Sequence, residues 1–174
     1  MDSLTKNKYI YIKNMLSVDL IEYLSTWHLM KDDQVPLAFS KHSSDSEIYS
    51  HLLYHLLPIM EKETNLKLKP MYSYSRLYLG GAELKKHLDR EACEISASIT
   101  LKYFYCDKTY QWPLCMGNTP INIKSGDGVI YKGCEIEHWR PIFQQPKKYW
   151  HHQVFVHYVD LNGPYADEKE EVYE

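Results

Sequence analysis

After Met71 the chain is divided into seven short segments rich in β-forming residues. The stretches between them contain Gly, Pro, Asp and Asn, residues that end strands and form turns. The segments read MYSYSRLYL, EISASITLKYFY, QWPLCM, INIKS, GVIYKG, EHWRPIF and YWHHQVFVHYVDL. A series of short strands of this kind predicts a double-sheet β fold.

The segment EISASITL gives the clearest strand pattern. Apolar side chains at positions 95, 97, 99 and 101 alternate with Ser96, Ser98 and Thr100. Successive side chains of a strand point to opposite faces of the sheet. We therefore expect a half-buried strand with one apolar face and one polar face.

The first third of the chain has a different character. KYIYIKN predicts a strand at about residues 8–12, and Ser17 has the position of an N-cap before a helix. A second helix is expected to begin near Ser46 and to end near EKETN. Apolar residues with helical spacing are Leu20, Ile21 and Leu24 in the first helix, and Ile48, Leu52, Leu56 and Met60 in the second. The predicted class is mainly β with supporting N-terminal helices (α+β).

Length and charge limit the function classes. The 174 residues suffice for one domain with its own core. We expect that domain to span residues 1–165 and to be followed by a frayed acidic tail, residues 166–174. The net charge is −3 and no basic stripe is visible, so a nucleic-acid partner is not expected. The first residues contain no long apolar run, so neither a signal peptide nor a membrane span is expected.

The cysteines and tyrosines add two expectations. Cys93, Cys106, Cys115 and Cys134 form no CxxC pair, which argues against a structural zinc site. Without a secretory signal, the thiols are expected to be reduced and the protein cytoplasmic. Sixteen tyrosines fit a sheet whose rings pack while the hydroxyl groups reach a ligand.

Three residues form a candidate metal site. His87 and Asp89 lie two positions apart, just before the EISASITL strand, and His138 lies in a later β segment. Alone, the His-x-Asp pair also fits a surface turn in which Asp89 accepts from backbone amides. With His138 the set becomes two imidazoles and one carboxylate, which leaves three adjacent positions open on Fe(II), as non-haem oxygenases require. Two of them would take 2-oxoglutarate and one O₂.

Such a site also needs a cation for the far carboxylate of 2-oxoglutarate. Arg140 follows His138 by two residues, so both side chains share one face of a strand, and a guanidinium can bind a carboxylate through two hydrogen bonds. Lys148 is the alternative. His151 and His152 are weaker candidates because their charge depends on pH.

These residues resemble the motif of the 2-oxoglutarate/Fe(II)-dependent dioxygenase superfamily, in particular its small prolyl-hydroxylase-like members from microbes and phages. The segments YLGGAELKKHLDRE and GDGVIYKGCEIEHWR carry the resemblance most specifically, and QVFVHYVDLNGP and the N-terminal strand and helices extend it over most of the chain. The resemblance implies a double-stranded β-helix (jelly-roll, cupin-like) core. It also implies a 2-oxoglutarate-dependent hydroxylase that uses Fe(II) and O₂.

The resemblance also assigns roles to individual residues. His87, Asp89 and His138 would be the iron ligands. Tyr103 matches a tyrosine that helps to hold the far carboxylate of 2-oxoglutarate, and Tyr78 matches a further contact to this co-substrate. Prolyl hydroxylases place their cation about ten residues after the second histidine, which favours Lys148, whereas the strand geometry favours Arg140.

Two departures from the family narrow the substrate. Prolyl hydroxylases carry a Gly-rich acidic stretch ending in Thr-x-Phe where this chain has CDKTYQWPLCMGN, which weakens the case for proline as the target. Nucleic-acid demethylases of the superfamily need arginines after the second histidine, and none follows Arg140 in this sequence. A peptidyl residue, with proline by analogy, and a small metabolite both remain candidate substrates.

Two other functions fit the same pattern. One is a non-catalytic jelly-roll module that binds a metal or another ligand. The other is a cupin-like metalloenzyme without a co-substrate, which a missing cation in the barrel would favour.

Overall fold

Two antiparallel sheets form the body of the protein. The structure, a computed structural model, describes residues 3–30, 35–37, 40–43 and 47–169. Within these residues the larger sheet has the strand order β1 (Tyr9–Ile12), β9 (Gly128–Lys132), β6 (Ile95–Phe104), β11 (Trp150–Asp160), β4 (Leu68–Leu79), β3 (Ser40–Ser43) and β2 (Val35–Leu37). The smaller sheet has the order β5 (Leu84–His87), β10 (His138–Arg140), β7 (Leu114–Met116) and β8 (Thr119–Ile121).

The chain passes repeatedly between the two sheets. From β4 onward it visits the larger sheet, the smaller sheet at β5, the larger at β6, the smaller at β7 and β8, the larger at β9, the smaller at β10 and the larger again at β11. All neighbouring strands are antiparallel. This winding is a double-stranded β-helix, so the predicted jelly-roll core is confirmed.

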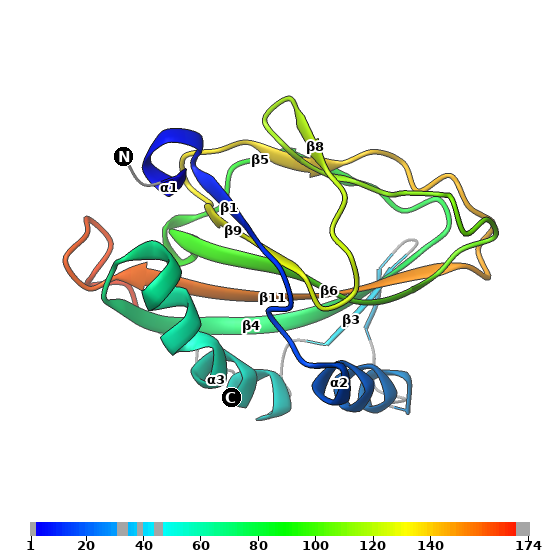
Figure 1. Ribbon diagram of the computed structural model, residues 1–174, viewed down its shortest axis with the longest axis horizontal. Coiled ribbons are helices and arrows are strands. Elements are labelled where there is room, and N and C mark those ends of the chain that lie inside the picture. Colours follow the sequence, from blue (N-terminus) through cyan, green and yellow to red (C-terminus); the bar gives the residue numbers. More distant parts are fainter. Residues whose placement is uncertain (1–2, 31–34, 38–39, 44–46, 170–174) are drawn as a thin grey trace.

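Helices α2 (Val18–Met30) and α3 (Glu47–Thr64) cover the outer face of the larger sheet. A short helix α1 (Ser3–Asn7) precedes β1, and a 3-10 turn η1 (Glu91–Cys93) precedes β6. Figure 1 shows α2 and α3 on one side of the larger sheet and the smaller sheet on the other. Ser17 is the N-cap expected from the sequence: its hydroxyl oxygen accepts a hydrogen bond from the Leu20 backbone N–H at 3.3 Å.

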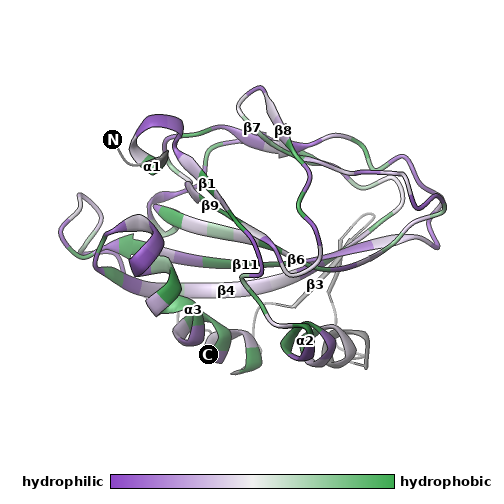
Figure 2. Cartoon of the chain, in the orientation of Figure 1, coloured by the Kyte–Doolittle hydropathy of each residue, from purple (hydrophilic) through white to green (hydrophobic). Residues whose placement is uncertain are grey.

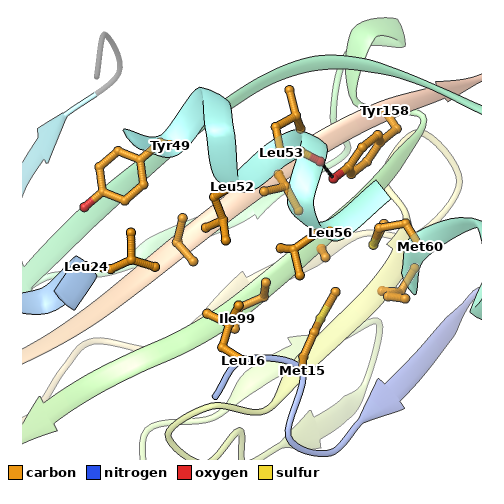
Figure 3. Close-up of a cluster of buried hydrophobic side chains, with 14 of the residues drawn as sticks. Met15, Leu16, Leu24, Tyr49, Leu52, Leu53, Leu56, Met60, Ile99 and Tyr158 are labelled. Carbon is orange, nitrogen blue, oxygen red and sulfur yellow. Dashed lines mark hydrogen bonds between the residues drawn. The ribbon is translucent and has the colours of Figure 1, made fainter. Parts of the chain in front are cut away.

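A hydrophobic core joins the helices to this sheet. Green and purple residues are interspersed along α3 in Figure 2, as expected for a helix with one buried face. Leu56 and Met60 of α3 and Ile99 of β6 are fully buried in this cluster. The hydroxyl group of Tyr158 on β11 donates to the Leu53 carbonyl oxygen at 2.6 Å, which ties the last strand to α3 (Figure 3).

The expectation of a half-buried strand at EISASITL was wrong. Ser96, Ser98 and Thr100 are as fully buried as their apolar neighbours. Their face of β6 does not meet water because it lines the space between the two sheets. The hydroxyl groups are satisfied there by hydrogen bonds, such as the one that Gln153 Nε2 donates to Ser98 Oγ at 2.8 Å.

Other boundaries also differ from expectation. INIKS forms no strand beyond Ile121, and LKKH, which shows no alternation, forms β5. Helix α1 and strands β2 and β3 were not anticipated. The predicted division at residue 165 stays a prediction. Lys69 Nζ donates to the carbonyl oxygens of Ala166 and Glu168, and residues 170–174 of the predicted tail lie outside the described residues.

None of the helices in the described parts of the chain is long and apolar enough to cross a membrane. The cytoplasmic location stays a prediction.

Candidate metal centre

The neighbouring strands β5 and β10 of the smaller sheet bring the three candidate ligands together. His87 is the last residue of β5 and His138 the first residue of β10, and the two are paired across the strands. The backbone N–H of Asp89 donates to the Gly133 carbonyl oxygen at 2.9 Å, which turns the carboxylate back toward the histidines. Asp89 Oδ1 lies 3.4 Å from His87 Nε2 and 3.4 Å from His138 Nε2.

Both imidazole rings are oriented as metal ligands. The Nδ1 atom of His87 is 2.7 Å from the Lys85 carbonyl oxygen, and the Nδ1 atom of His138 is 3.1 Å from the Ile136 carbonyl oxygen. A carbonyl oxygen can only accept, so each Nδ1 carries a proton, and with a cation bound each Nε2 would present its lone pair to the site. Such a backbone partner is the usual outer contact of a metal-binding histidine. The three donor atoms, which lie within 4.8 Å of one another, therefore fit a divalent cation.

The environment of Asp89 favours the ionised carboxylate. Burial raises the pKa of Asp89, but hydrogen bonds with His138 and His87 more than offset this effect and hold the pKa well below its usual range. Its second oxygen, Oδ2, is buried and has no hydrogen-bond partner among the described residues. Asp89 also lies beside Cys93 and His157, which are buried. A carboxylate with a free buried oxygen is suited to binding a cation.

Because Gly133 has no side chain, there is room beside it for the Asp89 carboxylate. A Cβ atom at this position would lie 2.5 Å from Asp89 Oδ2 and closer still to the Cys93 carbonyl oxygen. Because neither group can move freely, any larger residue would displace the carboxylate.

Replacing Gly133 by alanine is therefore expected to lower the free energy of unfolding by about 1–3 kcal/mol and to weaken metal binding. Urea unfolding and Fe(II) titration measure the two effects. Gly117→Ala is the control: no atom lies within 4 Å of its Cβ position, and its φ of +57° makes the change a backbone strain only. Equal Fe(II) affinity in the two variants would contradict the role of Gly133.

Arg140 is the buried cation of the barrel interior. It is 2% exposed, and its Nη1 donates to the Trp112 carbonyl oxygen at 2.7 Å. The guanidinium carbon lies 4.7 Å from the centre of the Trp112 ring. Nε and Nη2 find no hydrogen-bond partner, and no carboxylate pairs with Arg140 in the part of the chain that the structure describes. Burial of a guanidinium with unpaired donors is energetically unfavourable unless an anion binds to it.

His151 lies near Arg140 as a neutral group. Burial, and then the positive charge of Arg140, lower the pKa of His151 well below its usual value. Its Nε2 is 2.7 Å from Gln153 Oε1 and its Nδ1 is 2.6 Å from the hydroxyl oxygen of Tyr105. Nδ1 therefore accepts the phenol proton while Nε2–H donates to the amide. Arg140 is thus the charged group of this pair.

The remaining predicted residues lie in different environments. Lys148 is exposed in the loop before β11, with Nζ 5.2 Å from the Tyr149 ring centre. Tyr103 is 43% exposed and stacks on Tyr105 at 4.6 Å. Tyr78 is 1% exposed, its ring meets Trp112 edge-on at 5.0 Å, and its hydroxyl group has no hydrogen-bond partner within the described chain. The structure brings Tyr78 and Arg140 to one cluster, and leaves Lys148 outside it.

A pocket of about 320 Å³ adjoins this cluster. It shares Tyr105 and Trp112 with the surroundings of Arg140, and Tyr103, Lys108 and Lys124 complete its outer wall. His87, Asp89 and His138 are not among the residues that line it.

Sequence reasoning missed Arg76 on β4. The side chains of this strand alternate, and Tyr72, Tyr74 and Tyr78 point into the barrel, where Tyr74 stacks on Phe155 at 4.8 Å. Arg76 shares their face. The available signal was the repeat Y-S-Y-S-R-L-Y, in which a charged residue occupies a position of the inward series.

Comparisons with known proteins found solved structures that share the fold. No family model and no curated protein matches the sequence. SnoN, a non-haem α-ketoglutarate-dependent epimerase from nogalamycin biosynthesis, is 12% identical, with a TM-score of 0.74 over 90% of this chain and 79% of its own. A Pseudomonas putida prolyl-4-hydroxylase is 17% identical, with a TM-score of 0.70 over 91% and 95%. HygX from Streptomyces hygroscopicus, with nickel, 2-oxoglutarate and hygromycin B bound, is 12% identical, with a TM-score of 0.71 over 91% and 85%.

Proposed function

We propose that this chain, whose fold is that of the 2-oxoglutarate/Fe(II) oxygenases, is itself such an enzyme and acts as a hydroxylase. The observation that carries the proposal is the combination of two features in one barrel. These are a two-histidine, one-carboxylate set with both Nε2 atoms directed toward the carboxylate, and a buried guanidinium with free donors. Neither a hydrophobic core nor a purely structural metal site would require both features.

His87, Asp89 and His138 would hold Fe(II) through Nε2, a carboxylate oxygen and Nε2. When bound, the iron would activate O₂ and couple decarboxylation of 2-oxoglutarate to succinate with hydroxylation of a C–H bond of the substrate. Two neutral imidazoles and one carboxylate leave the Fe(II) site with one positive charge, which favours the anionic co-substrate.

Arg140 would bind the far carboxylate of 2-oxoglutarate through Nε and Nη2, the two groups without partners. Tyr78 presents a second unpaired donor in the same cluster and would share this carboxylate. The Trp112 carbonyl oxygen holds the guanidinium in place through Nη1. Tyr103, half exposed and stacked on Tyr105, would border the co-substrate rather than bind it from the interior. Lys148 has no part in this arrangement.

Buried aromatic rings would shield the inner side of the reacting centre from water. Tyr131 and His138 are buried with ring centres 4.7 Å apart, and Phe143 and Trp112 close the cluster around Arg140. A dry, fixed environment strengthens electrostatic contacts and protects a reactive oxidant from side reactions.

The substrate would be a peptidyl residue or a small molecule. Similarity to a prolyl-4-hydroxylase suggests the first, and similarity to HygX, solved with hygromycin B, suggests the second. The alternative function is a non-catalytic module that binds metal or ligand without turnover.

Two measurements on the Fe(II)-loaded protein separate the enzyme from the module. Under anaerobic conditions, 2-oxoglutarate is expected to produce a metal-to-ligand charge-transfer absorption band. In air, 2-oxoglutarate is expected to be converted slowly to succinate even without substrate. Absence of both the band and succinate would reject the oxygenase and favour the module.

A further inference from the structure

We infer that Arg76 forms a second anion site between the candidate metal centre and the Arg140 cluster and binds a carboxylate of the substrate. The inference rests on the proposed function and deepens it, because it selects one class of substrate: small molecules that carry a free carboxylate.

Arg76 is positioned by its strand. It lies between Tyr74 and Tyr78 on the inward face of β4, and pairs with Gln153 of β11 in the centre of the larger sheet. Its guanidinium carbon lies 5.8 Å from the Tyr74 ring centre and 5.4 Å from that of Tyr78. The two rings therefore hold the flat guanidinium group before any ligand binds, which lowers the entropic cost of binding.

The guanidinium lies close to the candidate metal centre. The guanidinium lies over the Tyr74 ring, the Tyr74 ring stacks on His157 with ring centres 5.8 Å apart, and His157 lies beside Asp89. Tyr74 and His157 thus connect Arg76 to the candidate iron ligand Asp89.

Arg76 has no counter-ion within the described chain. No carboxylate lies within ion-pair distance of it, and its Nε atom is buried without a hydrogen-bond partner. Its side chain is only partly buried, and the Tyr78 hydroxyl group is a polar neighbour of the guanidinium. A guanidinium in this setting is suited to a planar anion that supplies two acceptors.

With Fe(II) and 2-oxoglutarate bound, the charged groups inside the barrel would sum to one net positive charge. Fe(II), Arg76 and Arg140 would contribute four positive charges, and Asp89 and the two carboxylates of 2-oxoglutarate three negative ones. In a site of low dielectric, an uncompensated charge is unfavourable. A substrate with one negative charge would make the complete assembly neutral.

The co-substrate does not need Arg76. Its far carboxylate is assigned to Arg140, and its other carboxylate would be neutralised by the metal that it chelates. An internal residue of a peptide carries no backbone charge, whereas a free amino acid, an N-acylated amino acid or another carboxylic acid does. The geometry therefore favours a free carboxylate over an internal peptide residue.

The test compares matched pairs of probes on the Fe(II)-loaded protein: free and N-acetylated amino acids and the corresponding C-terminal amides. At least one acid is expected to accelerate 2-oxoglutarate consumption, and its amide is not. Arg76→Gln is expected to lose this acceleration by about 30-fold or more, and Arg76→Lys to restore part of it. Lys62→Gln, on the outer side of α3, is the charge-matched control and should behave as the unmodified protein.

Measuring the affinity for 2-oxoglutarate distinguishes a failure of this inference from a failure of the proposed function. The Arg76→Gln protein is expected to bind 2-oxoglutarate within about threefold of the unmodified protein, by the anaerobic absorption band. If its affinity falls as far as that of an Arg140 variant, the carboxylate at Arg76 belongs to the co-substrate and the inference is wrong. Equal acceleration by acids and amides, or none by any acid, also overturns it. Absence of 2-oxoglutarate binding by the unmodified protein instead rejects the proposed function itself.

Discussion

The His138→Ala protein is expected to lose Fe(II)-dependent formation of succinate from 2-oxoglutarate. His138 is 3% exposed, and its Nε2 faces Asp89 Oδ1 at 3.4 Å, so its replacement removes a buried donor from the candidate centre. Loss of an outer contact to a metal ligand already costs about 10–100-fold in affinity or activity, and loss of the ligand itself should cost more. Bound iron per protein and succinate per minute are the two quantities to measure.

The matched control is His55→Ala. His55 is an exposed histidine of α3, on the opposite side of the larger sheet from the metal centre. Its loss should leave both iron content and turnover unchanged. Undiminished succinate formation by a correctly folded His138→Ala protein would contradict the assignment of the iron ligands.

Replacing Arg140 by glutamine is expected to weaken 2-oxoglutarate binding by two to three orders of magnitude. Removing one partner of a buried ion pair costs about 3–5 kcal/mol, and each 1.4 kcal/mol corresponds to a factor of about ten in Kd. The dissociation constant comes from titration of the anaerobic absorption band. Iron binding is expected to persist, because Arg140 is not a metal ligand in this assignment.

Lys148→Gln is the comparison that the sequence itself suggests. Lys148 is exposed, and a solvent-screened ion pair contributes little, so the Kd for 2-oxoglutarate should change by less than about fivefold. Small, equal effects in the two variants would remove both residues from the co-substrate site. A large effect confined to Lys148→Gln would mean that its loop closes over the barrel when 2-oxoglutarate binds.

Local patterns predicted much of the fold. Alternation located β1 and β6, β-forming composition located β4 and β11, and the helical stripe with the Ser17 cap located α2. These signals are local because they depend on residue type and short-range spacing. LKKH shows no such pattern, and becomes β5 because β10 pairs with it. INIKS has the composition of a strand but forms none beyond Ile121.

The residues of the candidate site also differ in whether the sequence alone predicts them. His87, Asp89 and His138 can be proposed from residue type and spacing, because two histidines and a carboxylate have a specific metal chemistry. The repeat Y-S-Y-S-R-L-Y places Arg76 on the same face of its strand as the tyrosines, but only the packed sheets decide that this face points into the barrel.

The sequence by itself therefore determined the sheet-rich class, the supporting helices and the chemical identity of the candidate donors, all of which depend on residue type and short-range period. The tertiary structure decided burial and proximity. Arg140 and Lys148 are both cations near the end of the chain's β region, and the sequence left the choice open. Packing placed Arg140 in the barrel and Lys148 in solvent. The physical reason is that desolvation and charge compensation depend on segments that meet only after the two sheets have closed.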